Sequence, residues 1–181
     1  MIGVLVSGRG TNLQALIDAG LPVVAVASDR RDVPALQRAR EAGIPAATFS
    51  LDCHESREER DLVIATWLEQ HGVELVVLAG YMQILTKGFL DRFPGHIVNV
   101  HPSLLPEFPG LRAIAEALEA GVDTTGVTVH FVDEGVDTGP VIRQEEVAVE
   151  PRETLEDRIH AVEHRLLPDV VAGLLTRAAA P

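Results

Sequence analysis

The sequence predicts an α/β protein with a mostly parallel sheet, helices on its faces and an antiparallel strand pair near its C-terminal end. Apolar, β-branched runs alternate with helical patterns along the 181 residues, as in proteins built from βαβ units. The first five runs are apolar almost throughout, which is typical of parallel strands buried on both faces. The last two are joined by a short, turn-rich stretch, which favours antiparallel pairing.

Each element can be placed from its pattern. The apolar runs predict strands at residues 2–6, 23–27, 46–49, 75–79, 97–100 and 127–132 and within 141–149. Helical patterns lie at residues 12–19, 33–42, 56–71, 87–93, 112–120 and 154–177. Ser56 and Glu59 form a capping-box sequence that supports the start of the third helix. We expect a Rossmann-like arrangement in one domain, with residues 177–181 fraying at the end.

The composition excludes several classes of protein. Apolar residues make up 46% of the chain, as in globular rather than disordered sequences. No apolar run reaches the roughly 18 residues that span a bilayer, and no basic segment precedes the first strand, so we expect no signal peptide. Cys53 is the only cysteine, which leaves no intrachain disulfide and no thiolate metal cluster. A cytoplasmic protein without a metal fits these observations.

The net charge restricts the partners. It is −12, whereas a nucleic-acid binder usually carries a basic face. We therefore expect no nucleic-acid partner. An anionic small molecule remains compatible with this charge, because a few backbone N–H groups can hold a phosphate locally.

A glycine-rich turn, Ser-Gly-Arg-Gly-Thr-Asn-Leu at residues 7–13, joins the first strand to the first helix. A helix N-terminus offers N–H groups and partial positive charge, which suit a phosphate. Gly8 and Gly10 allow close approach to the backbone. We favour a monophosphate cradle at Gly10, Thr11 and Asn12, in which a side chain at Gly10 would enter the space of the phosphate. The simpler alternative is a tight turn without a ligand.

A dinucleotide site is a further alternative for this turn. It requires a third small residue where this chain has Leu13, whose side chain would disturb helix–sheet packing. In its favour, Asp29 lies near the end of the second strand, about where a ribose-binding acid would be. A P-loop is excluded, because no Gly-Lys pair followed by Ser or Thr is present.

Asn99 and His101 stand at the end of the fifth strand. Their spacing of two places both side chains on one face of the strand, and ligands bind at the carboxyl ends of the strands in open α/β sheets. Their two N–H groups could together stabilise an oxyanion. The alternative is a hydrogen-bonded strand end without a catalytic role.

The stretch of residues 132–140 contains turn formers and three carboxylates, those of Asp133, Glu134 and Asp137. We expect a loop between the last two strands. The carboxylates do not have the spacing of an EF-hand, so a catalytic or solvated acid is favoured over a calcium site. His130, on the preceding strand, is by itself more often a packed core residue than a catalyst.

These motifs occur in the same order in one family. Residues 7–13, 99–106 and 127–140, with residues 75–85 and the pair Glu163-His164, resemble the phosphoribosylglycinamide formyltransferase family over nearly the whole chain. The resemblance implies the formyltransferase fold in a single domain, residues 1–181. A phosphate-binding half would extend to about residue 100, and a folate and catalytic half would begin at about residue 101.

The resemblance also implies an activity and a set of residues. The activity is transfer of the formyl group of 10-formyltetrahydrofolate to the amine of 5'-phosphoribosylglycinamide in purine biosynthesis, with small-molecule partners, in a monomer or homodimer. The catalytic residues would be Asn99, His101 and Asp137, with His130 behind them. The ribonucleotide would contact Gly10, Thr11, Asn12 and Glu163. The folate would contact Arg57, Met82, Gln83, Ile84, Leu85, Asn99, Asp133, Glu134, Gly135, Val136 and Asp137.

These roles agree with the chemistry of the residues. When the amine attacks the formyl carbonyl, Asn99 can donate to the oxygen that becomes negative, and loss of such a donor typically costs about 100- to 1000-fold in rate. His101 can donate as well, and an ionised Asp137 nearby favours its charged form. The carboxylate could order a water that carries the proton from the amine to the leaving folate nitrogen, which is worth about 100- to 10,000-fold.

Other functions stay open as alternatives. A methionyl-tRNA formyltransferase would need a tRNA-binding domain and a basic surface, and a formyltetrahydrofolate deformylase would carry an extra N-terminal domain. A nucleotide-binding oxidoreductase is a more distant alternative. The chain departs from the common family pattern at Gln83, Glu107 and Leu167, and it has a shorter C-terminal tail than some members.

Overall fold

The structure, a computed structural model, describes residues 1–178. The chain divides after Val98 into two compact units, residues 1–98 and residues 99–181. Each unit has buried apolar side chains of its own, such as Leu5 and Val77 in the first and Val129 and Leu166 in the second.

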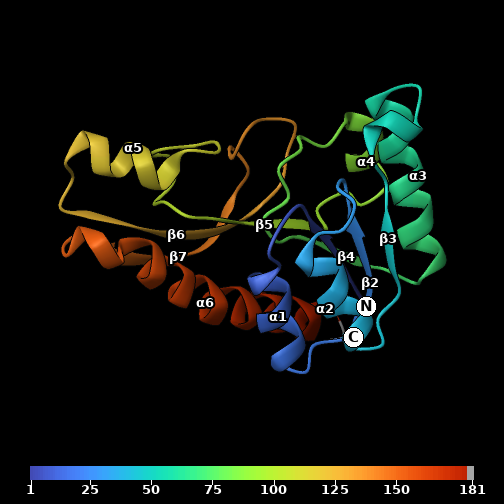
Figure 1. The fold of residues 1–181 in the computed structure, drawn as a ribbon, viewed down its shortest axis with the longest axis horizontal. Helices are drawn as coiled ribbons and strands as arrows, with labels where there is room; N and C mark the ends of the chain where they lie inside the picture. Colours follow the sequence, from blue (N-terminus) through green and yellow to red (C-terminus); the bar gives the residue numbers. More distant parts are fainter. Residues whose placement is uncertain (179–181) are drawn as a thin grey trace. The chain divides into compact units, whose positions relative to one another are not determined.

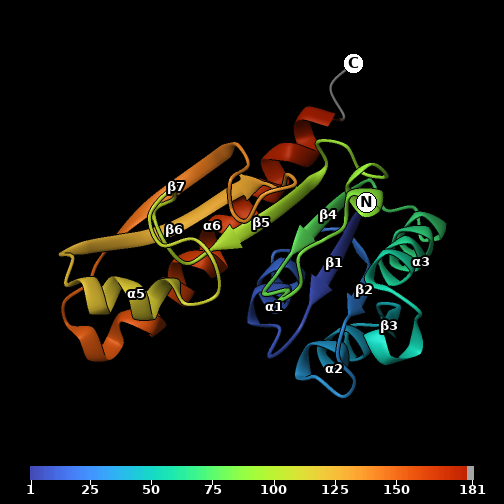
Figure 2. The same cartoon turned by 90° about the horizontal axis from the view of Figure 1, so that it is seen from above.

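The first unit is built on the parallel strands β1 (Ile2–Val6), β2 (Val23–Ser28), β3 (Ala46–Thr48) and β4 (Leu75–Leu78). β1 pairs with both β2 and β4, and β2 pairs with β3 (Figure 2). All five residues of β1 are buried, as expected for a strand covered on both faces. Because β1 and β4 run parallel, the turns that follow them lie at the same edge of the sheet.

Four α-helices and a 3-10 turn accompany these strands: α1 (Thr11–Asp18), α2 (Pro34–Glu41), η1 (Leu51–Cys53), α3 (Arg57–Gln70) and α4 (Lys87–Leu90). α1 lies beside α2, and α3 lies beside α4 (Figure 1). The Ser56 hydroxyl caps α3 by accepting the N–H of Glu59 at 3.1 Å, as the sequence predicts. The Glu59 carboxylate accepts the N–H of Glu55 at 2.6 Å, one residue earlier than in a standard capping box.

The second unit follows from β5 (Ile97–His101) and contains α5 (Ala113–Ala120), β6 (Thr124–Phe131), β7 (Val141–Ala148), the 3-10 turn η2 (Arg152–Thr154) and α6 (Leu155–Ala178). β6 and β7 pair antiparallel. α6 packs on both strands, and Figure 1 shows α5 and the start of α6 on opposite sides of β6. Within residues 1–178, none of the helices combines the length and apolar character that a bilayer-spanning segment needs.

The fold class predicted from the sequence is confirmed. The sheet has seven strands in the order β3-β2-β1-β4-β5-β6-β7, with parallel strands in the first unit and the antiparallel β6–β7 pair at its end. All the predicted strands and helices are present, and most of their boundaries lie within one residue of the prediction.

Two boundaries differ by three residues, and the end of α6 differs from the predicted fraying. β6 begins at Thr124 rather than at residue 127, because Thr124 and the next two residues pair with β7. α4 ends at Leu90 rather than at residue 93, ahead of Pro94, which disfavours a helical conformation in the residue before it. Arg177 continues α6 instead of fraying, and residues 179–181 lie outside the described part of the chain.

Candidate active site

The turn after β1 leads directly into the N-terminus of α1. Gly10 is the N-cap residue and has a left-handed φ of 71°, which favours glycine. Its carbonyl accepts the N–H of Gln14 at 2.9 Å and closes the first helical turn. Among the described residues, no side chain caps this helix, and its first turn carries no acid. This geometry is compatible with anion binding at the start of α1, and the phosphate cradle stays a prediction.

The two glycines of this turn differ in their surroundings. A Cβ atom on Gly10 would lie 2.5 Å from the Cβ atom of Ala35 and 2.7 Å from its Cα atom. The expectation that a side chain at Gly10 enters the phosphate space is therefore wrong, because it would meet α2 instead. A Cβ atom on Gly8 would have no neighbour within 4 Å. Gly8 is thus the glycine that keeps space open beside the turn.

The acid proposed for a dinucleotide site is engaged within the protein. Asp29 is 8% exposed, and its Oδ1 atom accepts a hydrogen bond of 2.6 Å from the Ser7 hydroxyl. Leu13, which stands where a dinucleotide site needs a small residue, is fully buried in the core. Both findings weigh against the dinucleotide alternative.

The predicted folate segment, residues 82–85, follows β4. Met82 and Ile84 are 46% and 55% exposed, whereas Leu85 is buried. The Arg57 guanidinium at the start of α3 donates to the Ile84 carbonyl at 2.5 Å. The structure therefore places Arg57 with this segment, as a support of its backbone, and leaves two apolar side chains exposed next to it.

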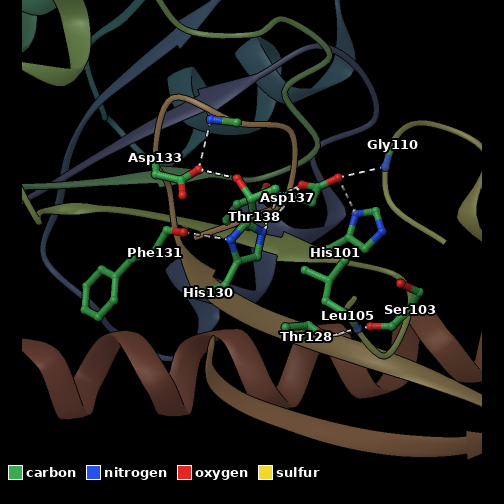
Figure 3. Close-up of polar contacts among 12 residues, drawn as sticks. His101, Ser103, Leu105, Gly110, Thr128, His130, Phe131, Asp133, Asp137 and Thr138 are labelled. Atoms are coloured by element: carbon green, nitrogen blue, oxygen red, sulfur yellow. Dashed lines mark hydrogen bonds and ion pairs between the residues drawn. The ribbon is translucent and has the colours of Figure 1, made fainter. Parts of the chain in front are cut away.

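Four groups of the second unit surround the Asp137 carboxylate (Figure 3). Its Oδ1 atom lies 3.3 Å from Asn99 Nδ2 and 3.5 Å from His130 Nε2. Its Oδ2 atom lies 3.4 Å from His101 Nδ1 and accepts the N–H of Gly110 at 2.8 Å. Asn99 and His101 project from β5, His130 from β6, and Asp137 from the β6–β7 loop. The structure thus brings together the predicted trio and His130.

These contacts keep Asp137 ionised. Burial alone would raise its pKa, but the hydrogen bond with His130, the Gly110 N–H and the charge of His101 outweigh that effect and lower the pKa to about 2. The Asp137 side chain is only 13% exposed. At neutral pH the cluster therefore contains a mostly buried negative charge, which its neighbours stabilise.

Protein acceptors hold the two histidine rings in place. His101 Nε2 lies 2.8 Å from the Phe108 carbonyl, and its Nδ1 faces Asp137. A ring with two N–H groups, the imidazolium, satisfies both acceptors. His130 Nδ1 lies 2.7 Å from the Phe131 carbonyl. When the ring carries its only proton on Nδ1, its Nε2 lone pair accepts from Asn99 Nδ2, 3.2 Å away, and when Nε2 is protonated as well, it donates to Asp137 Oδ1, 3.5 Å away.

This arrangement orients the amide of Asn99. The NH₂ group of an asparagine has two donors, and here one faces Asp137 and the other His130. Both contacts exceed the usual N–H···O distance of about 2.9–3.0 Å. The amide is thus oriented by long, weak bonds that a better acceptor can replace.

The loop after β6 folds around Asp133. Its Oδ1 atom accepts the N–H of Gly135 at 3.0 Å and the Thr138 hydroxyl at 2.7 Å (Figure 3). A Cβ atom on Gly135 would lie 2.0 Å from the Thr138 hydroxyl oxygen, so the turn requires glycine there. Val136 is 47% exposed. Glu134 is also exposed, so this loop presents several of the predicted folate residues to solvent.

Sequence reasoning missed the polar network beneath the catalytic groups. The buried Thr128 hydroxyl donates to the Ser103 carbonyl at 2.6 Å and accepts the N–H of Leu105 at 3.1 Å. Gln144 donates to the same hydroxyl at 2.9 Å. The Ser103 hydroxyl donates to the Glu107 carbonyl at 2.5 Å and lies 3.3 Å from the Phe108 carbonyl, which faces His101. In the sequence, the only sign of this network was the serine that directly follows His101 and Pro102.

The four residues predicted to contact the ribonucleotide are divided between the two units. Glu163 is 5% exposed on α6, whereas Gly10, Thr11 and Asn12 belong to the first unit. Among residues 1–178, no group of three or more His, Cys, Asp or Glu side chains is arranged to hold a metal ion.

Comparison with known proteins identifies the family. The sequence pattern described as formyl transferase matches residues 1–171. The chain belongs to the formyl transferase family. This membership agrees with the site of the second unit, where an amide, two imidazoles and one ionised carboxylate gather without a nucleophilic side chain.

Three relatives illustrate the similarity. Phosphoribosylglycinamide formyltransferase of Mycobacterium tuberculosis (strain CDC 1551 / Oshkosh) is 46% identical, over 96% of this chain and 84% of that protein. The crystal structure of phosphoribosylglycinamide formyltransferase from Bacillus Halodurans is 40% identical with a TM-score of 0.94, over 98% of this chain and 96% of that one. The trifunctional purine biosynthetic protein adenosine-3 of Drosophila pseudoobscura pseudoobscura is 45% identical over 98% of this chain, which spans only 14% of that protein's length. The resemblance inferred from the motifs is confirmed.

Proposed function

We propose that this chain transfers the formyl group of 10-formyltetrahydrofolate to the amine of 5'-phosphoribosylglycinamide, in a single formyltransferase domain. The observation that carries the proposal is the Asp137 carboxylate, held with a pKa of about 2 between two imidazoles and the amide of Asn99. The relatives named above supply the substrate assignment.

Asp137 orders the proton transfer of the reaction in this proposal. An amine that attacks a carbonyl carbon must lose a proton, and the leaving folate nitrogen must gain one. A carboxylate with a pKa near 2 is a weak base, so it serves best by holding and polarising a water that relays the proton. The long contacts around its Oδ1 atom, 3.3 and 3.5 Å, leave room for that water to compete for the carboxylate.

Asn99 is the donor to the developing oxyanion. Its NH₂ group faces Asp137 and His130, and an oxygen carrying negative charge is a stronger acceptor than an imidazole nitrogen. Exchange of the 3.2 Å contact with His130 for the oxyanion therefore costs little. A donor prepared in this way stabilises the transition state more than the substrate.

His101 contributes charge in this arrangement. Its two ring nitrogens are occupied by Phe108 and Asp137, so direct donation to substrate requires Nε2 to leave the Phe108 carbonyl. A positive charge on this ring would stabilise both the carboxylate and the forming oxyanion, because the low local dielectric strengthens the interaction.

The first unit supplies ligand binding. The start of α1, from Gly10 to Asn12, would hold the phosphate of the ribonucleotide through backbone N–H groups. Exposed Met82 and Ile84 would offer an apolar surface to the folate ring. In the second unit, Glu163 is the residue proposed to contact the ribonucleotide, and residues 133–137 are those proposed to contact the folate.

A formyl-transfer assay tests the proposal. Purified protein is mixed with 10-formyl-5,8-dideazafolate and the ribonucleotide, and the absorbance of the deformylated product is followed. We expect product only when the ribonucleotide is present. Deformylation without the ribonucleotide would indicate a hydrolase instead, and binding of NADH without folate binding would revive the oxidoreductase alternative.

A further inference from the structure

One buried serine next to the phosphate turn is hydrogen bonded to the chain that leads into the folate segment. Ser7 lies between the end of β1 at Val6 and the phosphate turn, and it is 2% exposed. Its hydroxyl accepts the N–H of Met82, the first residue of the folate segment, at 2.9 Å. Its own N–H donates to the Gly80 carbonyl at 3.1 Å. Ser7 therefore makes two hydrogen bonds to the chain that leads from β4 into the folate segment.

Asp29 determines which way the Ser7 hydroxyl donates. A serine hydroxyl has a single proton, and here it is donated to Asp29 Oδ1 at 2.6 Å. Because a carboxylate only accepts, the lone pairs of the Ser7 oxygen are left for the N–H of Met82. One carboxylate at the end of β2 thus orders a hydroxyl at the end of β1 and, through it, a backbone group after β4.

The rest of the folate segment is held by similar contacts at alternate residues. Arg57 donates to the Ile84 carbonyl at 2.5 Å, and Asp61, fully buried, accepts the N–H of Thr86 at 2.8 Å. These two anchors come from α3 and do not touch the phosphate turn. Of the three anchors, the one at Met82 is the one shared with that turn.

We propose that Ser7 is a positioning residue that ties the phosphate turn (residues 8–12) to residues 81–86, the stretch that contains the folate segment. Asp29 fixes the direction in which the Ser7 hydroxyl donates its proton. The assignment of the two segments rests on the proposed function. The physical link does not, because it is a property of the free protein. Loss of the hydroxyl removes the acceptor of the Met82 N–H and the donor to Asp29 Oδ1, and both segments lose a shared constraint.

The test compares Ser7→Ala with the wild type in two ways. Hydrogen exchange of the free protein, followed by mass spectrometry, should become faster in residues 8–12 and in residues 81–86 together. In the transfer assay, KM for both substrates should rise about fivefold, the effect of roughly one net hydrogen bond, while kcat stays within about twofold because the proposed catalytic groups lie elsewhere.

Three further variants sharpen the test. Ser50→Ala removes a hydroxyl of the same unit outside both segments and should leave their exchange unchanged. Asp29→Asn keeps an oxygen that can accept from Ser7 and should behave nearly as the wild type. Ser7→Cys keeps the side-chain volume with a weak donor and acceptor, and it decides the question if Ser7→Ala does not fold.

Two results would overturn the proposal. One is faster exchange in residues 8–12 with unchanged exchange in residues 81–86. The other is a fall in kcat at unchanged KM, which would place Ser7 in the chemistry. If the wild type shows no formyl transfer, the proposed function fails, and the exchange result still decides whether Ser7 joins the two segments.

Discussion

Substitution of Asp137 by Asn is the sharpest perturbation of the catalytic cluster. The amide has the shape of the carboxylate and can still accept the N–H of Gly110 at one oxygen. Its NH₂ group, however, must face either His101 or the pair Asn99 and His130, where the wild type presents an acceptor. The water relay loses its base, so we expect kcat to fall about 100- to 10,000-fold, with KM little changed.

The same substitution has a cost in stability that follows from the pKa of Asp137. The pKa of about 2 in the folded protein lies below the ordinary aspartate value of 3.8. At 1.36 kcal/mol per pKa unit this corresponds to about 2 kcal/mol of stabilisation. Because the pKa is lowered in the folded state, this contribution is fully present above about pH 5 and is lost as the pH falls toward 2.

Two assays measure these effects. Transfer of the formyl group gives kcat and KM at pH 7, and urea unfolding at several values between pH 7 and pH 3 gives the free energy of unfolding. Asp123→Asn is the matched control, because it removes an exposed carboxylate from the same unit. Asp137→Asn should lower the free energy of unfolding at pH 7 by about 2 kcal/mol and flatten its decline in acid.

Two outcomes would refute the reasoning. A variant with the kcat of the wild type would remove Asp137 from the mechanism. A variant whose stability declines in acid as steeply as that of the wild type would show that the depressed pKa belongs to other carboxylates.

Three further substitutions test the surroundings of the site. Gly8→Ala should leave the melting temperature unchanged, because its Cβ atom meets nothing within 4 Å. The added methyl group should occupy space beside the phosphate turn and weaken ribonucleotide binding about tenfold, or roughly 1.4 kcal/mol. Equal affinity in titration calorimetry would contradict the cradle. Gly10→Ala should instead destabilise the protein by at least about 1–2 kcal/mol, the cost of a left-handed residue, since its Cβ atom also meets Ala35; an unchanged urea midpoint would disprove this. Thr128→Val should cost about 1–3 kcal/mol in urea unfolding by leaving the Ser103 carbonyl without its donor, and full stability would show that the network is dispensable.

The sequence predicts the layers of this fold well because they depend on local patterns. Continuous apolar runs specify buried parallel strands wherever they occur, and the turn-rich stretch between β6 and β7 specifies an antiparallel return. The errors fall at ends. β6 is extended by pairing with β7 from Thr124 onward, and such pairing is a tertiary property that periodicity does not encode.

In the candidate site, too, some features follow from local sequence patterns and others depend on the three-dimensional fold. Asn99 and His101 can be paired from the sequence, because period two places them on one face of a strand. Their contacts with Asp137 depend on how the loop after β6 returns to β5, and its residue 137 has a left-handed φ of 53°. Likewise, nothing local marks Gly110 as a donor to that carboxylate. The motifs thus identify the candidate catalytic residues, while the structure shows the hydrogen bonds that orient their side chains.

Asp29 shows why a residue's position in a motif does not by itself give its role. Near the end of the second strand, an acid is compatible with a ribose contact and with a structural one, and the sequence leaves both open. The two differ in what the carboxylate touches. Here one oxygen accepts the buried hydroxyl of Ser7, and that hydroxyl also holds Met82. A ribose that bound Asp29 at that oxygen would have to break the bond that orders the folate segment, so the acid serves better as the fixed end of a hydrogen-bond chain than as a ligand contact.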